Sequence, residues 1–132
     1  MRDVFIDSTK KEVTNINIDA EKALKEYYKY IDCHCVAGVA IYDSYPHTLY
    51  LDDNALLSDA KQNAFEILGQ RFIGNGLIVG LDEDEGDDTD SKMTAFYVNQ
   101  LVTFCERRPE DEARIQFFSF DDLEEIKEAK AN

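Results

Sequence analysis

Carboxylates form the densest group of chemically active side chains in this sequence. Between Leu81 and Ser91 the chain reads DEDEGDDTD, where only a glycine and a threonine interrupt the acidic residues. The carboxylates are Asp82, Glu83, Asp84, Glu85, Asp87, Asp88 and Asp90. Such side chains can bind a divalent cation, or can meet the lysines and arginines of a basic partner. A block of like charges can also serve solubility alone, because its members repel one another and stay hydrated.

An EF-hand type of calcium loop does not fit the spacing of these residues. Such a loop places oxygen ligands at alternate positions, a glycine at the sixth and a glutamate at the twelfth. If Gly86 is the sixth residue, the first is Leu81 and the twelfth is Lys92, and neither can serve. We therefore predict no defined metal site, and assign the seven carboxylates to a surface for a partner. The alternative hypothesis is irregular binding of a divalent cation or small ligand by residues 82–90.

Histidine and cysteine indicate no second site. The CHC motif at residues 33–35 begins a predicted strand, 33–42, on which the histidine points away from both cysteines. A tetrahedral zinc site would need further ligands, and only Cys105 and His47 remain. The cysteines are therefore interpreted as small buried apolar residues. No serine or cysteine is spaced around either histidine in a recognisable catalytic pattern, so we predict no catalytic residue, no enzyme and no cofactor.

The glycines of residues 74–80, GNGLIVG, do not form a dinucleotide-binding motif. The third glycine of that motif would fall at Val79, and a helix should follow, whereas an apolar run follows here. This run, Leu77–Val79, lacks alternation, which predicts a strand covered on both faces. Gly74–Gly76 is predicted to form the hairpin turn before this strand. Gly80 is predicted to mark a bulge or the close approach of another backbone.

The remaining sequence predicts short strands that surround these motifs. Alternating or apolar runs bounded by turn residues are found at residues 2–6, 12–18, 33–42, 48–51, 65–68, 70–73, 102–105 and 114–118. Because both faces of the strand at 33–42 are mostly apolar, it is predicted to be central in the sheet. A turn containing Pro46, at residues 43–47, would connect it to the next strand.

Helices are predicted at three places. At residues 20–31 the apolar positions form one stripe, and Asp19 offers an N-cap. Residues 92–101 are mildly amphipathic, with Thr94 as a cap and with Met93, Phe96, Tyr97 and Leu101 as buried positions. A final helix follows Ser119 and runs to about Lys130. Residues 55–64 fit either a short helix or a surface loop.

These elements predict an α+β fold, with a single small mixed or antiparallel sheet and two to three helices packed on it. A length of 132 residues and a hydrophobic content of 44% indicate one folded domain. Residues 1–105 are predicted as its α+β core. Residues 106–132 are predicted as a C-terminal strand–helix extension packed on the same domain.

Charge limits the classes of partner. The formal net charge is −14, and the acidic excess begins after residue 31, since residues 1–31 hold equal numbers of acids and bases. Such a field repels nucleic acid and anionic membranes, and attracts basic proteins or cations. No apolar run approaches the ~18 residues that cross a bilayer. An odd number of cysteines and the lack of an apolar leader predict a reduced, cytoplasmic location.

The order of these features resembles a family of small uncharacterised phage and prophage proteins, a domain of unknown function with an α+β fold. The similarity covers about residues 2–105, and its most specific parts are residues 74–80 and 86–90. The resemblance implies a phage accessory gene that is expressed in the host cytoplasm. It carries over no catalytic residues.

Charge, fold and resemblance together predict a non-enzymatic acidic binding protein. We expect a phage accessory factor that engages a basic, nucleic-acid-binding surface of a host protein, as a nucleic-acid mimic or inhibitor. Direct contact with nucleic acid or membrane is not expected. The rival hypotheses are the cation or small-ligand binder described above and an acidic domain whose charge serves only solubility. The sequence does not predict an oligomeric state.

Overall fold

The computed structural model of this chain describes residues 1–55, 60–109 and 111. Its helices are α1 (Ala23–Ile31), which a 3-10 turn at Ala20–Lys22 precedes, and α2 (Ala95–Leu101). Its strands are β1 (Arg2–Asp7), β2 (Glu12–Asn17), β3 (Val36–Asp43), β4 (Tyr45–Asp52), β5 (Asn63–Ile67), β6 (Gln70–Ile73), β7 (Gly76–Leu81), β8 (Asp88–Thr89) and β9 (Thr103–Glu106).

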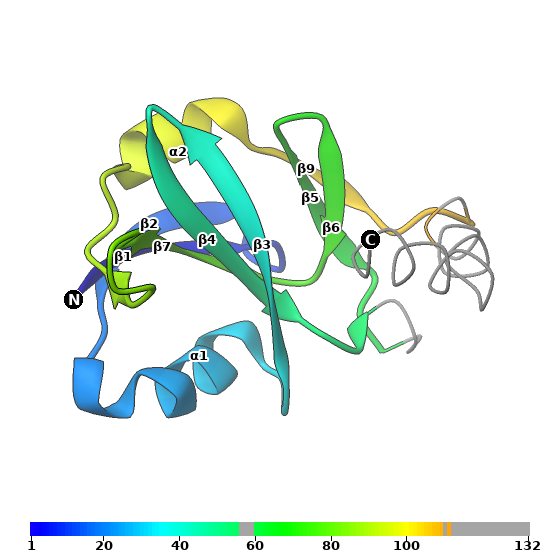
Figure 1. The fold of residues 1–132 in the computed structure, drawn as a ribbon. Coiled ribbons are helices and arrows are strands. Elements are labelled where there is room, and N and C mark those ends of the chain that lie inside the picture. Colours follow the sequence, from blue (N-terminus) through cyan, green and yellow to red (C-terminus); the bar gives the residue numbers. More distant parts are fainter. Residues whose placement is uncertain (56–59, 110, 112–132) are drawn as a thin grey trace, which may run out of the picture.

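The strands form two antiparallel sheets. The large sheet has the order β2-β1-β7-β4-β3, with β8 as a further partner of β7. The small sheet has the order β6-β5-β9. Figure 1 shows α1 on one side of the large sheet, with α2 and the small sheet on the other side. The α+β class is confirmed in this sheet-rich form, but the prediction of a single sheet was wrong.

The N-terminal third folds as its local patterns predict. β1 and β2 pair along their whole length, from Arg2 opposite Asn17 to Asp7 opposite Glu12. The Asp19 carboxylate accepts a hydrogen bond from the Glu21 amide at 3.0 Å, and so caps the 3-10 turn that leads into α1. The helix therefore begins and ends close to the predicted boundaries.

The hairpin of β3 and β4 corrects two predictions. β3 is an edge strand of the large sheet, not a central one. Its apolar character comes largely from small residues such as Ala37, Gly38 and Ala40, which bury little area. The chain turns at Ser44 alone, whose φ is 64°, so Pro46 and His47 belong to β4 and not to a turn. Proline is tolerated there because β4 pairs with β7 only from His47 onward.

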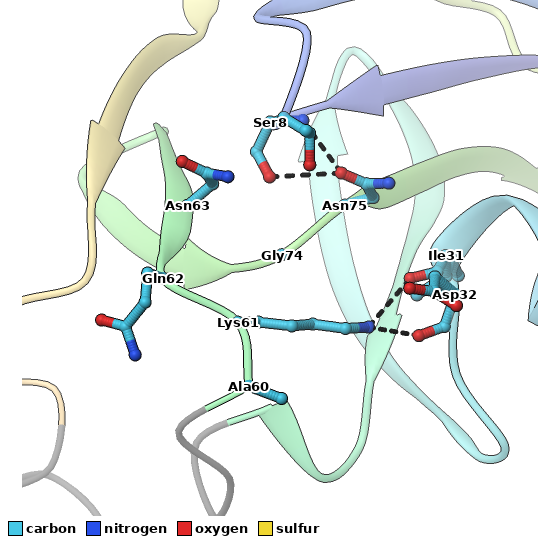
Figure 2. A pocket seen from close by; sticks show the side chains of 10 residues that line it. Ser8, Ile31, Asp32, Ala60, Lys61, Gln62, Asn63, Gly74 and Asn75 are labelled. Carbon is cyan, nitrogen blue, oxygen red and sulfur yellow. Dashed lines mark hydrogen bonds between the residues drawn. The ribbon is translucent and has the colours of Figure 1, made fainter.

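The Gly74–Gly76 segment joins the two sheets instead of closing a hairpin. β6 lies in the small sheet and β7 in the large one, so the predicted hairpin was wrong, although Gly74 does adopt a positive φ of 86°. Figure 2 shows the Asn75 side chain next to Ser8, whose amide and hydroxyl donate to Asn75 Oδ1 at 2.9 and 3.2 Å. Asn75 Nδ2 donates to the Tyr30 carbonyl at 3.2 Å. One asparagine thereby ties this connection to β1 and α1.

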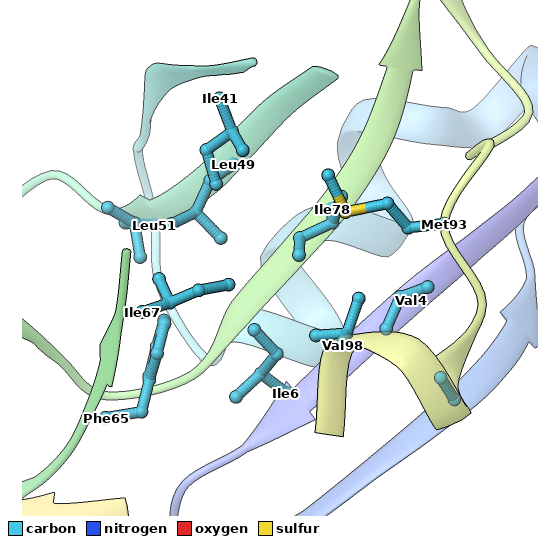
Figure 3. Packing of buried hydrophobic residues seen from close by; sticks show 11 residues of the cluster. Val4, Ile6, Ile41, Leu49, Leu51, Phe65, Ile67, Ile78, Met93 and Val98 are labelled. Atoms are coloured by element: carbon cyan, nitrogen blue, oxygen red, sulfur yellow. The ribbon is translucent and has the colours of Figure 1, made fainter. Parts of the chain in front are cut away.

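β7 is covered on both faces, as its unbroken apolar run predicts. Leu77, Ile78 and Val79 are all fully buried. Ile78 belongs to the larger core, which Figure 3 shows between the large sheet, β5 and α2. Its buried members are Val4, Ile6, Ile41, Leu49, Leu51, Phe65, Ile67, Ile78, Met93, Ala95 and Val98. Leu77 and Val79 face α1, where they pack with Ile18, Tyr27 and Ile31.

α2 is shorter than predicted, and its buried face is different. Thr94 caps it, as expected, by accepting a hydrogen bond from the Tyr97 amide. Since the helix begins only at Ala95, its inward stripe is Ala95 and Val98. Phe96 and Tyr97 are 78% and 39% exposed, so the prediction that they are buried was wrong.

The strand predicted at 102–105 is confirmed as β9, which pairs with β5. The strand predicted at 114–118 and the final helix lie outside the described residues, as does most of the predicted extension, 106–132.

Candidate functional site

The acidic segment forms a hydrogen-bonded turn between β7 and β8. The Asp82 amide donates to the Asp87 carbonyl at 2.9 Å, and the Gly86 amide donates to the Asp82 carbonyl at 2.6 Å. The Asp82 carboxylate accepts from the amides of Asp84 and Glu85 at 3.0 and 3.4 Å. These bonds satisfy the backbone locally, as in other aspartate-capped turns. Gly86 completes the turn with a φ of 76°.

The structure divides the seven predicted carboxylates into two groups. Four point into solvent and are called the acidic turn below: Glu83, Asp84, Glu85 and Asp87. Asp82, Asp88 and Asp90 bond within the fold. Asp88 accepts hydrogen bonds from the hydroxyls of Tyr27 and Tyr50, each at 2.9 Å, and Asp90 accepts from the Arg2 amide at 2.7 Å. The block of charge is therefore not one uniform surface.

No ion pair reaches the acidic turn from the described residues. The ion pairs in that part of the chain join Lys61 to Asp52, and Arg71 to both Glu66 and Asp111. The four carboxylates consequently repel one another, and no described lysine or arginine lies within ion-pair distance of them. An approaching cation or basic side chain would relieve that repulsion.

A buried carboxyl group, Asp3, lies at the base of this region. Its side chain is 1% exposed, and neither carboxylate oxygen has a hydrogen-bond partner among the described residues. Burial raises the pKa of Asp3 to about 7, against the opposing effect of the N-terminal ammonium group. The charges of Asp88 and Asp90 raise it further. The sequence contained a signal for this site, because Asp3 lies on the same face of a predicted strand as the apolar residue Phe5.

Tyr27 and Tyr50 lie next to the same carboxylates. Their rings stack at 4.9 Å between centroids, and both hydroxyls donate to Asp88. Burial, together with the Asp88 carboxylate, raises the pKa of each tyrosine well above its usual range. The hydroxyls therefore stay protonated and donate to the Asp88 carboxylate. The sequence placed Tyr27 only within the predicted helix at 20–31, since its partner residues Tyr50 and Asp88 are distant in the chain.

His47 is a buried structural residue. Its side chain is 1% exposed, and its Nε2 accepts a hydrogen bond from the Lys92 amide at 2.9 Å. The ring proton therefore lies on Nδ1, which is 3.0 Å from the Tyr45 carbonyl oxygen. His47 thus ties β4 to the segment that follows the acidic residues.

The prediction that the cysteines are small buried residues holds only in part. Cys33 and Cys105 are half-buried, and burial raises the pKa of each thiol. Cys35 is exposed, because it precedes the edge strand β3 instead of lying in a central one.

Within the described residues, no three histidine, cysteine, aspartate or glutamate side chains are placed to hold a metal ion. None of the described helices is long and apolar enough to cross a membrane.

A polar cavity of about 170 Å³ lies where the two sheets meet, but its lysine is already engaged. Lys61 Nζ lies 2.8 Å from an Asp52 carboxylate oxygen. It also donates to the carbonyls of Ile31 and Asp32 at the end of α1, as Figure 2 shows. A cation at the carboxyl end of a helix is favourable for the helix dipole. This cavity is therefore interpreted as structural, because its lysine connects the end of β4 to the end of α1.

Replacing Lys61 with methionine is expected to lower the free energy of unfolding by about 2 kcal/mol, because Asp52 and two helix-terminal carbonyls lose a charged donor. Urea denaturation measures the change. Lys10→Met, at an exposed turn position, is the matched control and should leave the midpoint unchanged. Equal changes in the free energy of unfolding for the two substitutions would show that the contacts of Lys61 with Asp52 and α1 do not stabilise the fold.

Comparisons with known proteins place the chain in a family. No curated protein and no solved structure matches the sequence. A family model described as "Domain of unknown function (DUF3846)" matches residues 1–101, from β1 to the end of α2. The predicted resemblance to a domain of unknown function is thereby confirmed over nearly the predicted range. On that match, the chain belongs to the DUF3846 family.

Proposed function

We propose that this protein is a non-enzymatic binding protein whose acidic turn engages a basic surface of a protein partner. The observation that carries the proposal is the turn itself. Its own hydrogen bonds hold Glu83, Asp84, Glu85 and Asp87 outward, and none of the four forms an ion pair with another described residue. A surface that is already arranged loses less conformational entropy on binding than a flexible acidic tail would.

The chemistry of the partner follows from charge. A net charge of −14 attracts surfaces rich in lysine and arginine and increases the rate of encounter with them. Surfaces that bind nucleic acid are of this kind. The full proposal is a phage accessory factor that occupies such a surface on a host protein in the cytoplasm, as a nucleic-acid mimic or inhibitor. The phage and host setting rests on the resemblance alone.

Cation binding by residues 82–90 has less support than protein binding. Asp82 already accepts two backbone amides and Asp88 already accepts two tyrosine hydroxyls. The described residues also contain no group of three ligands placed for a metal. Calorimetry with calcium and magnesium tests this alternative, and saturable heat would favour it over the protein partner.

Neutralising the acidic turn is expected to weaken binding to a basic partner by about 30-fold, because four exposed charge pairs of about 0.5 kcal/mol each are lost. The variant is E83Q/D84N/E85Q/D87N. Its control, E12Q/E21Q/D53N/E106Q, removes the same charge from exposed positions on other elements and should weaken binding by less than about threefold. Partners are captured from host lysate, identified by mass spectrometry, and their dissociation constants measured at low and high salt.

Two outcomes would contradict the proposal. Equal weakening by both variants would show that total charge, and not the acidic turn, determines binding. A captured partner whose affinity does not change with salt would show that binding is not electrostatic.

A further inference from the structure

A groove with tyrosine walls lies at the same end of the large sheet as the acidic turn. Its volume is about 230 Å³, and its walls include Tyr45 and Tyr97. His47 and Met93, both buried, also line it, and Lys92 is the cation among its lining residues. These residues define the tyrosine groove. Figure 1 shows its two sides, the tip of the β3–β4 hairpin and α2, next to each other.

Strand register places this groove close to the acidic turn. His47 pairs with Gly80, and Asp82 follows Gly80 by two residues. On the other side of the acidic turn, the Lys92 amide is hydrogen-bonded to His47 Nε2. The chain thus leaves the groove region at Gly80, forms the acidic turn, and returns to the groove at Lys92.

The groove also carries exposed aromatic area. Tyr45 is 56% exposed and Tyr97 is 39% exposed. Two further exposed aromatic residues belong to the elements that form the sides of the groove: Tyr42 in β3 is 69% exposed and Phe96 in α2 is 78% exposed. Exposed apolar residues that gather in one place mark interaction sites more often than scattered ones do. Tyrosine is also among the residues that contribute most to protein–protein affinity.

We propose that the tyrosine groove binds an apolar side chain from a basic segment of the partner protein, while flanking lysines or arginines of that segment meet the acidic turn. The inference rests on the proposed function and specifies the partner: a segment that combines one apolar residue with several basic ones. Apolar contact would supply affinity that salt does not screen, and the acidic turn would supply attraction at long range.

Charge favours this occupant over others. A second copy of the chain would bring another acidic turn and a net charge of −14 toward the first, and the two would repel. An anionic membrane would be repelled for the same reason. Only a basic occupant gains from both the groove and its acidic neighbour.

Two short peptides test the inference by fluorescence anisotropy. Both consist of lysine and arginine, and they differ at one central position, which is leucine in one and serine in the other. The wild-type protein is expected to bind the leucine peptide about tenfold more tightly, as burial of one aliphatic side chain predicts. Y45S/Y97S should lose this preference and still bind both peptides at low salt. F96S removes an exposed aromatic residue that does not line the groove, and should keep the preference.

The outcomes separate the two proposals. If the wild type binds both peptides equally, and E83Q/D84N/E85Q/D87N weakens both, the proposed function stands and the groove inference is overturned. If the wild type binds neither peptide, the proposed function fails, and the groove inference fails with it. Loss of the preference in F96S to the same degree as in Y45S/Y97S would also overturn the assignment to this groove. The wild-type comparison uses no substitution, so it does not depend on whether a variant folds.

Discussion

Asp3→Asn is expected to stabilise the protein near pH 8 by on the order of 4 kcal/mol, and to have little effect near pH 4. Burial raises the pKa of Asp3 from 3.8 to about 7 in the folded state. The folded protein therefore holds this proton more tightly than the unfolded chain does. Stability that is present below pH 3.8 is lost as the pH rises toward 7, and the loss becomes constant above that value. Asparagine has nearly the same shape and never ionises, so it removes the loss.

The measurement is the free energy of unfolding of wild type and variant across that pH range. Only the difference between the two curves is informative, because other carboxylates change the free energy of unfolding with pH in the opposite direction. Asp53→Asn, at an exposed position, is the control, and its difference curve should be flat. If the Asp3→Asn difference curve is also flat, Asp3 is not buried as an unpartnered carboxyl group.

Gly80→Ala is expected to cost about 3 kcal/mol of stability, at the upper end for an overpacked site. A Cβ at this position would lie 2.2 Å from the Asp90 carbonyl oxygen and 3.0 Å from Thr89 Cγ2. A backbone oxygen cannot rotate away as a side chain can, so β7 and β8 would have to separate. That separation would also displace the acidic turn, and we therefore expect weaker binding to a basic partner.

Thermal unfolding measures the loss, and Gly38→Ala provides the comparison. On the edge strand β3, the nearest atom to a new Cβ at Gly38 is a side-chain methyl, Thr48 Cγ2, at 3.1 Å. Its cost should be no more than about 1 kcal/mol. Equal melting temperatures for the two variants would show that β8 does not approach β7 as closely as the structure places it.

The parts of the fold that were predicted correctly depend on local signals. The strands β1 and β2 and the capped helix ending at Ile31 follow from residue patterns within short stretches of the chain. Gly80 was correctly predicted to mark a close approach of backbone, which proves to be that of Asp90. The division into two sheets depends on distant pairings, such as β5 with β9, which no local pattern encodes. Gly74 suits a hairpin and a crossing between sheets equally well, because glycine permits the positive φ that either can require.

The candidate site was predicted only in part, for a similar reason. The seven carboxylates were recognised as a group, but their separation depends on β8, a strand of two residues, and on tyrosines from α1 and β4. The tyrosine groove combines residues 45 and 97, which are far apart in the sequence. Asp3 could have been recognised as a buried acid from the sequence, since an acidic residue that shares a strand face with an apolar residue is a local signal.

Binding at the acidic turn can be tested by titrating the ¹⁵N-labelled protein with a lysine- and arginine-rich peptide and recording two-dimensional amide NMR spectra. We expect the largest shift changes at Glu83–Asp87, and we expect added salt to reverse them. Changes concentrated on the small sheet, or spread evenly over the chain, would contradict the claim that the acidic turn is the binding surface.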